Sequence, residues 1–247
     1  MYKKKILFLI LLILSIYGCS KDDGYNPIIG NNLFPLTQGN RLEYNMYDLD
    51  SSFTKIEGTD RKFIREIGSS KYVIDRIGYP MLETYYNISG SIEKTDTTYV
   101  YKSASDDTIS YYMKFIFPLS NNNKLIFYKW APVFIRGAGT LSYYTIIDTT
   151  ITVSTSLSNT EYPVPLNIKI QNYIFDQDKI SVPENTAGYK CNKIEMYYSL
   201  SIAGVTLRSG TYYQIWFAEG VGPIKERKTY TEKENGTNIE LSAKSIK

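Results

Sequence analysis

Eight segments of strand-like composition follow one another along most of this chain, and they constrain its fold more than any other feature. They are rich in Ile, Val, Thr, Tyr and Phe, and several alternate apolar and polar residues with a period of two. Clusters of Gly, Asn, Ser and Asp separate them, as expected for turns. The segments are residues 71–79, 97–103, 108–117, 124–135, 141–154, 167–175, 193–203 and 211–217.

The sequence pattern does not support α-helices in this part of the chain. No segment of 12 or more residues carries an apolar stripe of period 3.6 with capping residues at its ends. Half of the positions in the strand-like segments are polar, which is typical of a sheet that buries one face. The pattern therefore predicts an all-β domain with an antiparallel sheet.

One short pattern occurs twice. The segments FPLTQGNRLEYN from Phe34 and FPLSNNNKLIFY from Phe117 align without gaps over 12 residues, at an offset of 83. Proline suits the entry to a strand, where its missing N–H removes no ladder hydrogen bond. The repeat indicates either two related β-meander halves or the chance recurrence of a strand-entry turn.

The N-terminus has the order of charges and apolar residues found in secretory signals. Lys3, Lys4 and Lys5 precede an almost entirely aliphatic run from Ile6 to Ile16. A membrane-spanning helix needs about 20 apolar residues, so this run is too short for a stable span. We expect a removable signal peptide over residues 1–18.

The end of that run, Ile16-Tyr17-Gly18-Cys19, resembles a bacterial lipobox. The resemblance implies that the Cys19 thiol receives a diacylglycerol, that the chain is cut before it, and that the new amine is acylated. Several acyl chains give stable anchoring, because each buried CH₂ contributes about 0.8 kcal/mol. The alternative is a chance cysteine near an ordinary signal end.

The residues that follow, Ser20-Lys21-Asp22-Asp23, resemble the short tag that sends Bacteroidota-type lipoproteins to the outer face of the outer membrane. The alternative is a solvated spacer, since so polar a segment cannot form a core. We expect residues 19–33 to be a lipidated cysteine with a flexible tether, and residues 34–247 to be one all-β domain. The expected location is the outer membrane, with its periplasmic and external faces left open.

Charge and cysteine content narrow the list of partners. The formal charge of +3 comes from Lys3, Lys4 and Lys5, which leaves 28 − 3 = 25 basic against 25 acidic residues. Without a basic stripe, nucleic-acid binding has little electrostatic support. If Cys19 carries lipid, Cys191 has no cysteine to pair with, and it is expected to be an inert buried thiol.

Three segments together resemble a broad group of uncharacterised Bacteroidota lipoproteins. They are FPLTQGNRLEY from Phe34, ISVPENTAGYKCNKIE from Ile180 and WFAEGVGPIKER from Trp216. The resemblance implies a long, curved antiparallel sheet or half-open barrel, similar to the LolA/LolB-like lipoprotein carriers. It does not imply their activity, because a fold does not fix a function.

The segment Gly220-Val221-Gly222 invites comparison with a phosphate-binding loop. It lacks the GxxxxGK[ST] frame, and no helix is expected after it. We expect a tight turn that leads into a strand, with glycines that allow positive φ or close packing.

Few residues of this sequence are candidates for catalytic groups or metal ligands. The sequence has no histidine, which excludes His-based triads and most zinc sites. The nearest carboxylate pairs in the sequence are Asp106 with Asp107 and Asp176 with Asp178, and we expect both to lie in solvated turns. The segment DQDK at 176–179 lacks the glycine and terminal glutamate of an EF-hand loop, so no metal or other cofactor is expected. A glycosidase pair assembled from distant strands stays open.

Tyrosine is the one compositional excess with a physical consequence: the chain has 24. Neighbours in a strand point to opposite faces, so each tyrosine doublet is expected to place one ring in the core and one on the other face. Such rings suit sugars, peptides or lipid headgroups, although tyrosine also favours strands for other reasons. The doublets are Tyr85-Tyr86, Tyr111-Tyr112, Tyr143-Tyr144, Tyr197-Tyr198 and Tyr212-Tyr213.

These observations favour a lipid-anchored, non-catalytic binding module of the outer membrane. Its ligand would be hydrophobic or a glycan, or its partner an envelope protein docked on an aromatic face. The alternatives are a carboxylate-based hydrolase that acts on glycans, which needs a carboxyl group of raised pKa in a cleft, and a purely structural envelope protein.

Overall fold

The computed structural model describes residues 33–118, 124–138, 142–157, 160–229 and 238–246. These residues form thirteen β-strands and no helix, so no described helix has the length and apolarity to cross a membrane. The strands are β1 (Arg41–Leu49), β2 (Arg61–Ile67), β3 (Lys71–Val73), β4 (Arg76–Tyr86), β5 (Ile92–Lys102), β6 (Thr108–Pro118), β7 (Lys124–Ile135), β8 (Tyr143–Leu157), β9 (Thr160–Val182), β10 (Asn185–Ile202), β11 (Val205–Ala218), β12 (Gly222–Lys228) and β13 (Asn238–Ile246).

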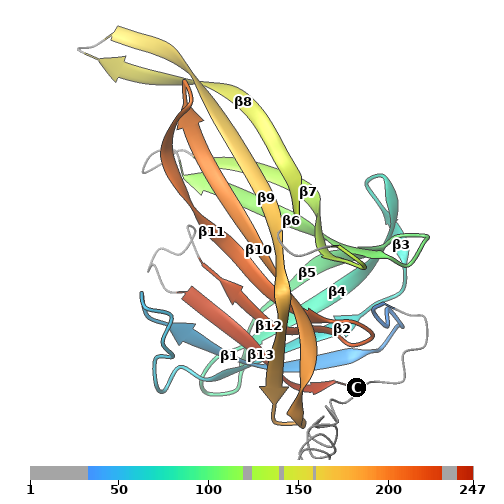
Figure 1. The fold of residues 1–247 in the computed structure, drawn as a ribbon. Coiled ribbons are helices and arrows are strands. Elements are labelled where there is room, and N and C mark those ends of the chain that lie inside the picture. Colours follow the sequence, from blue (N-terminus) through green and yellow to red (C-terminus); the bar gives the residue numbers. More distant parts are fainter. Residues whose placement is uncertain (1–32, 119–123, 139–141, 158–159, 230–237, 247) are drawn as a thin grey trace, which may run out of the picture.

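The strands form one antiparallel sheet that curves almost into a closed barrel (Figure 1). Its order is β7-β6-β5-β4-β2-β1-β13-β12-β11-β10-β9-β8, and the short β3 pairs with β4. The sheet thus consists of two meanders, β1 to β7 and β8 to β13, joined where β1 pairs with β13. This confirms the all-β, antiparallel and curved fold expected from the sequence.

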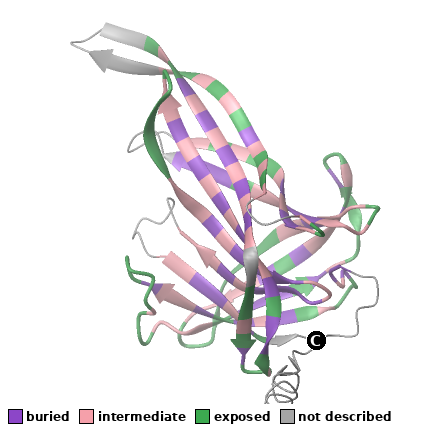
Figure 2. Ribbon diagram, viewed as in Figure 1, coloured by how far each residue is buried: buried purple, intermediate pink, exposed green. Residues whose placement is uncertain are grey.

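Alternation along the strands places the core on the concave face. In β10, Ile194, Met196, Tyr198 and Leu200 are buried, whereas the residues between them are half-buried. Figure 2 shows this alternation as bands of purple and pink along the tall strands. Each fully buried large apolar side chain contributes about 1.5–3 kcal/mol, so the register is strongly specified.

The glycines at 220–222 form a tight turn between β11 and β12, as expected. Gly220 donates its N–H to the carbonyl of Leu33 at 2.8 Å, and Gly222 adopts a φ of 115°. A Cβ at Gly222 would collide with the Phe34 ring, which packs edge-on against Phe217 at 5.6 Å between ring centres. The turn therefore holds the start of the domain against the core and leaves no role for a phosphate.

The repeated FPL pattern does not mark the two meanders. The first copy, from Phe34, precedes β1, whereas Phe117 and Pro118 of the second copy end β6. Both copies lie in the first meander at positions that are not equivalent. The interpretation as two related halves is therefore wrong, because a Pro/Asn-rich turn serves equally well before a first strand and between later ones.

Candidate functional site

A line of rings crosses the outer face of β4, β5, β6 and β7. Pro80 lies opposite Tyr99, Tyr99 opposite Tyr112, and Tyr112 opposite Trp130. Adjacent strands are about 4.8 Å apart, so these rings follow one another at the spacing of the sheet. We call Tyr99, Tyr101, Tyr112, Tyr128 and Trp130 the aromatic row.

The opposite face of the same strands fixes the orientation of the row. Val100, Tyr111 and Ala131 are opposite one another and fully buried in the core. Their neighbours Tyr99, Tyr112 and Trp130 must point to the other face, because successive side chains alternate. The row is therefore on the convex side.

The rings of the row contact each other and stay open to solvent. Tyr112 lies 5.2 Å from Trp130 and is stacked on Tyr128 at 6.0 Å and 21°. Tyr101 contacts the other side of Trp130 at 6.0 Å. Tyr128 is 52 % exposed, and the other four are half-buried. Tyr101, Trp130, Tyr112 and Tyr128 therefore form a continuous aromatic surface, and Tyr99 lies opposite Tyr112 on the next strand.

The turn between β3 and β4 holds the indole in place. Trp130 donates its Nε1–H to Asp75 Oδ1 at 3.0 Å, and Asp75 also accepts two hydrogen bonds from Arg76, at 3.0 and 2.7 Å. Arg76 stacks its guanidinium over Tyr101 at 4.8 Å. Chiefly through the Arg76 hydrogen bonds, the pKa of the Asp75 carboxyl is lowered. Asp75 and Arg76 are therefore paired with each other, whereas Lys71 lies over the Tyr99 ring at 5.0 Å.

The other tryptophan lies on the second meander in a closed environment. Trp216 donates its Nε1–H to Asp178 Oδ2 at 2.8 Å, and Lys193, Lys225 and Arg227 lie over its ring at 5.1–5.8 Å. Trp216 is only 6 % exposed. The three cationic side chains cover the Trp216 ring, so a ligand cannot reach it.

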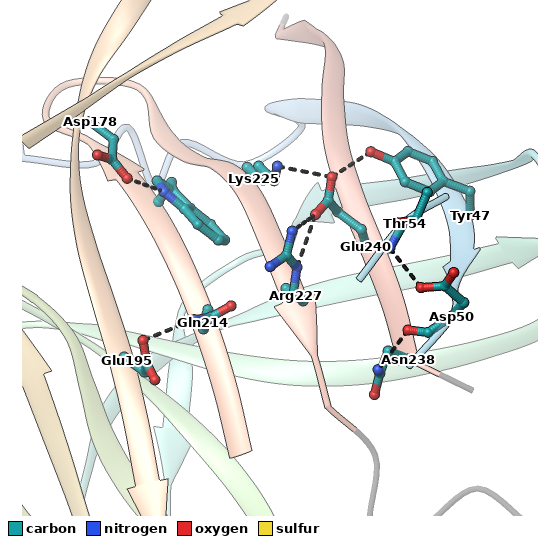
Figure 3. A network of polar contacts seen from close by, with 11 residues as sticks. Tyr47, Asp50, Thr54, Asp178, Glu195, Gln214, Lys225, Arg227, Asn238 and Glu240 are labelled. Atoms are coloured by element: carbon teal, nitrogen blue, oxygen red, sulfur yellow. Dashed lines mark hydrogen bonds and ion pairs between the residues drawn. The ribbon is translucent and has the colours of Figure 1, made fainter. Parts of the chain in front are cut away.

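Glu240 organises two of these cations (Figure 3). It accepts hydrogen bonds from Arg227 at 2.8 and 3.1 Å, forms an ion pair with Lys225 at 3.0 Å, and accepts the hydroxyl of Tyr47. Burial raises the pKa of Glu240, but Tyr47, Lys225 and Arg227 outweigh it and lower the pKa overall.

A charged cluster is buried inside the barrel. Arg65 donates to Glu83 at 2.8 Å through Nε and to both carboxylate oxygens of Glu226, one of them at 2.9 Å. Tyr85 donates its hydroxyl to Glu83 at 3.1 Å. Arg65 is 2 % exposed and Glu226 is fully buried. Removing one partner from such a group costs about 3–5 kcal/mol, so the cluster ties β2, β4 and β12 together.

The ionisation of this cluster is that of an ion pair. Burial alone would raise the pKa of Glu83, but Arg65 and Lys228 hold it below its usual value. Burial raises the pKa of the nearby Tyr44 and Tyr111 phenols well above 10. The Tyr111 hydroxyl is buried with no hydrogen-bond partner among the described residues. The pKa of the Glu83 carboxyl and those of the Tyr44 and Tyr111 phenols are therefore shifted away from neutral pH.

The residues singled out in the N-terminal sequence lie outside the described part of the chain. These are Cys19, Lys21, Asp22 and Asp23. Their expected lipidation and sorting roles stay predictions.

Cys191 is fully buried, as expected. Its Sγ contacts the Tyr189 carbonyl at 3.5 Å. Burial, followed by the nearby Asp178 carboxylate, raises the pKa of its thiol to about 12. The thiolate, which is the reactive form, is therefore suppressed.

The first carboxylate pair, Asp106 with Asp107, lies in the turn between β5 and β6 and makes structural hydrogen bonds there. Asp107 accepts the hydroxyls of Ser103 and Thr108, which lower its pKa to about 2. Asp106 accepts the backbone N–H of Leu33 at 3.2 Å. These bonds attach the N-terminal end of the domain to the β5–β6 turn.

The second pair is not in a turn. Residues 176–179 lie inside β9, where Asp178 is opposite Cys191 and accepts the Trp216 N–H. The turn expectation is wrong because polar residues alternate on the outer face of a long strand as readily as they form turns. No group of three or more potential metal ligands occurs among the residues that the structure describes.

The tyrosine doublets follow the expected alternation in part. One ring is buried and its neighbour half-buried at Tyr111-Tyr112 and Tyr197-Tyr198. Tyr212 and Tyr213 instead face the same cavity. A register shift makes Tyr212 an extra residue between Thr211 and Tyr213, so it does not alternate.

Sequence reasoning missed the buried cluster, although its residues occupy positions that could have identified it. Arg65 occupies the same face of β2 as Phe63 and Ile67, and Glu226 the same face of β12 as Ile224. Charged residues at apolar positions of a period-2 pattern are the signal that would have identified them.

Comparisons with known proteins find similar solved structures but no matching family. No protein-family model and no curated protein matches the chain. A candidate lipoprotein from Parabacteroides distasonis is similar in structure, with a TM-score of 0.49 and 13 % identity over 87 % of this chain and 98 % of that one. A candidate exported protein with a YmcC-like fold from Bacteroides fragilis has a TM-score of 0.49 and 12 % identity over 87 % and 99 %. The resemblance of the three sequence segments to Bacteroidota lipoproteins stays a prediction.

Proposed function

We propose that this protein is an outer-membrane lipoprotein, anchored through Cys19, whose β-domain binds a glycan on the aromatic row without changing it chemically. The observation that carries the proposal is the in-register alignment of Tyr99, Tyr112 and Trp130 on an open, convex face. The lipobox resemblance at residues 16–19 supports the location.

The chemistry of the row favours a sugar chain. Aromatic rings offer apolar faces to the C–H groups of sugars, and tyrosine hydroxyls offer polar tips. The Asp75 and Arg76 charges beside the row are paired with each other. Lys71 lies over the Tyr99 ring at 5.0 Å, and the exposed Lys114 is opposite Tyr128, so hydrogen-bond donors for sugar hydroxyls border the rings. A row that crosses successive strands gives a chain several consecutive contacts.

The ionisation of the carboxylates favours binding over hydrolysis. A glycosidase needs one carboxyl group with a raised pKa as its general acid. Glu83, which lines a cavity between the two meanders, has a lowered pKa instead, because Arg65 and Lys228 stabilise its charged form. The hydrolase alternative would require Asp96, opposite Glu83 on β5, to supply the acid.

Affinity electrophoresis tests the proposal. The purified lipoprotein in detergent is run through native gels that contain amylopectin, xylan, laminarin or mannan. We expect retardation by at least one polysaccharide, which Trp130→Ala and Tyr112→Ala abolish. Tyr143→Ala is the matched control, since Tyr143 is an exposed tyrosine on β8, away from the row.

Two results would contradict the proposal. Retardation that survives both row substitutions would place binding elsewhere. Release of new reducing ends from the retained polysaccharide, abolished by Asp96→Asn, would show a hydrolase.

A further inference from the structure

A cavity of about 260 Å³ opens on the concave face, between the two meanders. Its walls come from β4 and β5 on one side and from β11 and β12 on the other, with β6 between them. The lining residues are Glu83, Tyr85, Lys94, Asp96, Thr98, Lys114, Tyr212, Tyr213, Lys228 and Thr229. None of them is aliphatic, so the lining does not suit a lipid chain.

The register shift in β11 builds one wall. It turns Tyr212 and Tyr213 toward the same space. Tyr212 donates its hydroxyl to the Lys114 carbonyl at 3.2 Å and packs on Phe115 at 5.4 Å, which joins the two meanders at the cavity. Lys114 lies opposite Tyr128 of the outer row, so its backbone, and not its ammonium group, borders the cavity.

The opposite wall carries paired charges. Across β4 and β5, Glu83 is opposite Asp96, and Tyr85 is opposite Lys94. Lys94 lies over the Tyr85 ring at 5.0 Å and 3.5 Å from the Asp96 carboxylate. With Lys228 on the far wall, two cations face two anions. The cavity therefore has no net charge to attract an ion.

The same groups alternate donors and acceptors. Glu83 uses one carboxylate oxygen for Arg65 and the other for Tyr85, which leaves further lone pairs on each oxygen. Asp96 and the Lys114 carbonyl add acceptors, and Lys94, Lys228 and Thr98 add donors. A ligand whose groups each donate and accept, as hydroxyls do, matches this lining.

We propose that this cavity binds one uncharged monosaccharide, with a ring against the tyrosines and its hydroxyls on Glu83, Asp96 and the lysines. The cavity has room for more than water, since its volume of about 260 Å³ far exceeds the roughly 10–15 Å³ that a single water needs on the same measure. The site is on the opposite face of β4 to β6 from the aromatic row, so each can be occupied without the other.

Ligand-observed saturation-transfer NMR, followed by calorimetric titration, tests the proposal with the intact lipoprotein in detergent. The neutral probes are glucose, galactose, mannose and N-acetylglucosamine; glucuronate, inorganic phosphate and hexanoate are the charged and apolar probes. We expect at least one neutral sugar to bind, with at least tenfold weaker affinity in Asp96→Ala and Lys94→Ala. Both residues are exposed at the mouth, so neither change should unfold the protein.

Thr95→Ala is the matched control, because Thr95 is exposed and, between Lys94 and Asp96 in regular register, points to the other face of β5. Its affinity should equal that of the unchanged protein. The proposal is overturned if no neutral sugar binds, if only the charged or apolar probes bind, or if both mouth variants bind as tightly as the control. Polysaccharide retardation in Trp130→Ala tests the row separately, so failure at one site is distinguishable from failure at the other.

Discussion

The two tryptophans of this protein occupy comparable positions with opposite consequences. Each lies on the outer face of one meander, Trp130 on β7 and Trp216 on β11, and each donates its indole N–H to an aspartate. Each also has cations over its ring. Yet Trp216 is 6 % exposed, whereas Trp130 is half-buried beside the 52 % exposed Tyr128.

The difference shows that neither the hydrogen bond nor the cation decides whether an aromatic residue can bind a ligand. At Trp216, the stems of Lys193, Lys225 and Arg227 cover the ring, and Glu240 fixes two of them. At Trp130, Asp75 accepts the indole N–H, Arg76 alone lies over the ring, and other rings continue its surface. The closed site stabilises the fold, and the open one is available for recognition.

The largest expected effect is on stability at the closed site. Trp216→Ala should lower the free energy of unfolding by about 3–5 kcal/mol, because it removes a large buried side chain. Chemical denaturation followed by circular dichroism measures the change. Trp216→Phe, which keeps most of the packing, should lose much less. A loss below 1 kcal/mol in the alanine variant would show that Trp216 is not structural.

At the open site, the large effect should be on binding. Trp130→Ala should weaken polysaccharide binding by about 2 kcal/mol or more, roughly 30-fold, as expected for an aromatic hot spot. Its free energy of unfolding should fall by less than that of Trp216→Ala, since the ring is only half-buried. Equal stability losses at the two tryptophans would remove the distinction between them.

Acid titration should separate the closed site from the rest of the protein. The folded-state pKa of Glu240 is lowered, so its stabilisation is present above the unfolded pKa of about 4.5 and is lost as pH falls through the folded value. Glu240→Gln should cost about 1.5 kcal/mol at pH 7 and flatten the fall in stability below pH 4.5. Unfolding curves from pH 3 to 7 test this, and an unchanged acid limb would contradict it.

The smallest expected effect is at the edge of the aromatic row. Tyr128→Ala should weaken polysaccharide binding by about 0.5–1 kcal/mol, because it removes one stacked ring and leaves Tyr112 and Trp130 in place. Its stability should not change measurably, since the ring is mostly exposed. Retardation in affinity gels and a melting curve give the two values. A loss as large as that of Trp130→Ala would move the centre of the site to Tyr128.

Local patterns predicted many of the strands and several turns. Residues 71–79, expected as one strand-like segment, instead form the hairpin of β3 and β4, and β2 and β13 were not identified. Composition and alternation predicted a strand over 193–203, which lies within β10, and the glycines at 220–222 predicted the turn before β12. The all-β fold follows from such signals because each strand must bury one face.

The sites could not be predicted in the same way. Tyr99, Tyr112 and Trp130 align only through the registers of two hairpins, one of which contains a β-bulge. Tyr212 faces the cavity only because a register shift displaces it from its expected face. Arg65 and Glu226 are 161 residues apart, and their contact depends on closure of the sheet. Register and closure are set by the whole fold.

Fluorescence of Trp130 alone tests the central claim most directly. The chain has two tryptophans, so Trp216→Phe leaves Trp130 as the only one. Titration of this variant with the retained polysaccharide should produce a saturable change in emission and protect the indole from acrylamide quenching. The contradicting result is unchanged emission and quenching while the polysaccharide still binds.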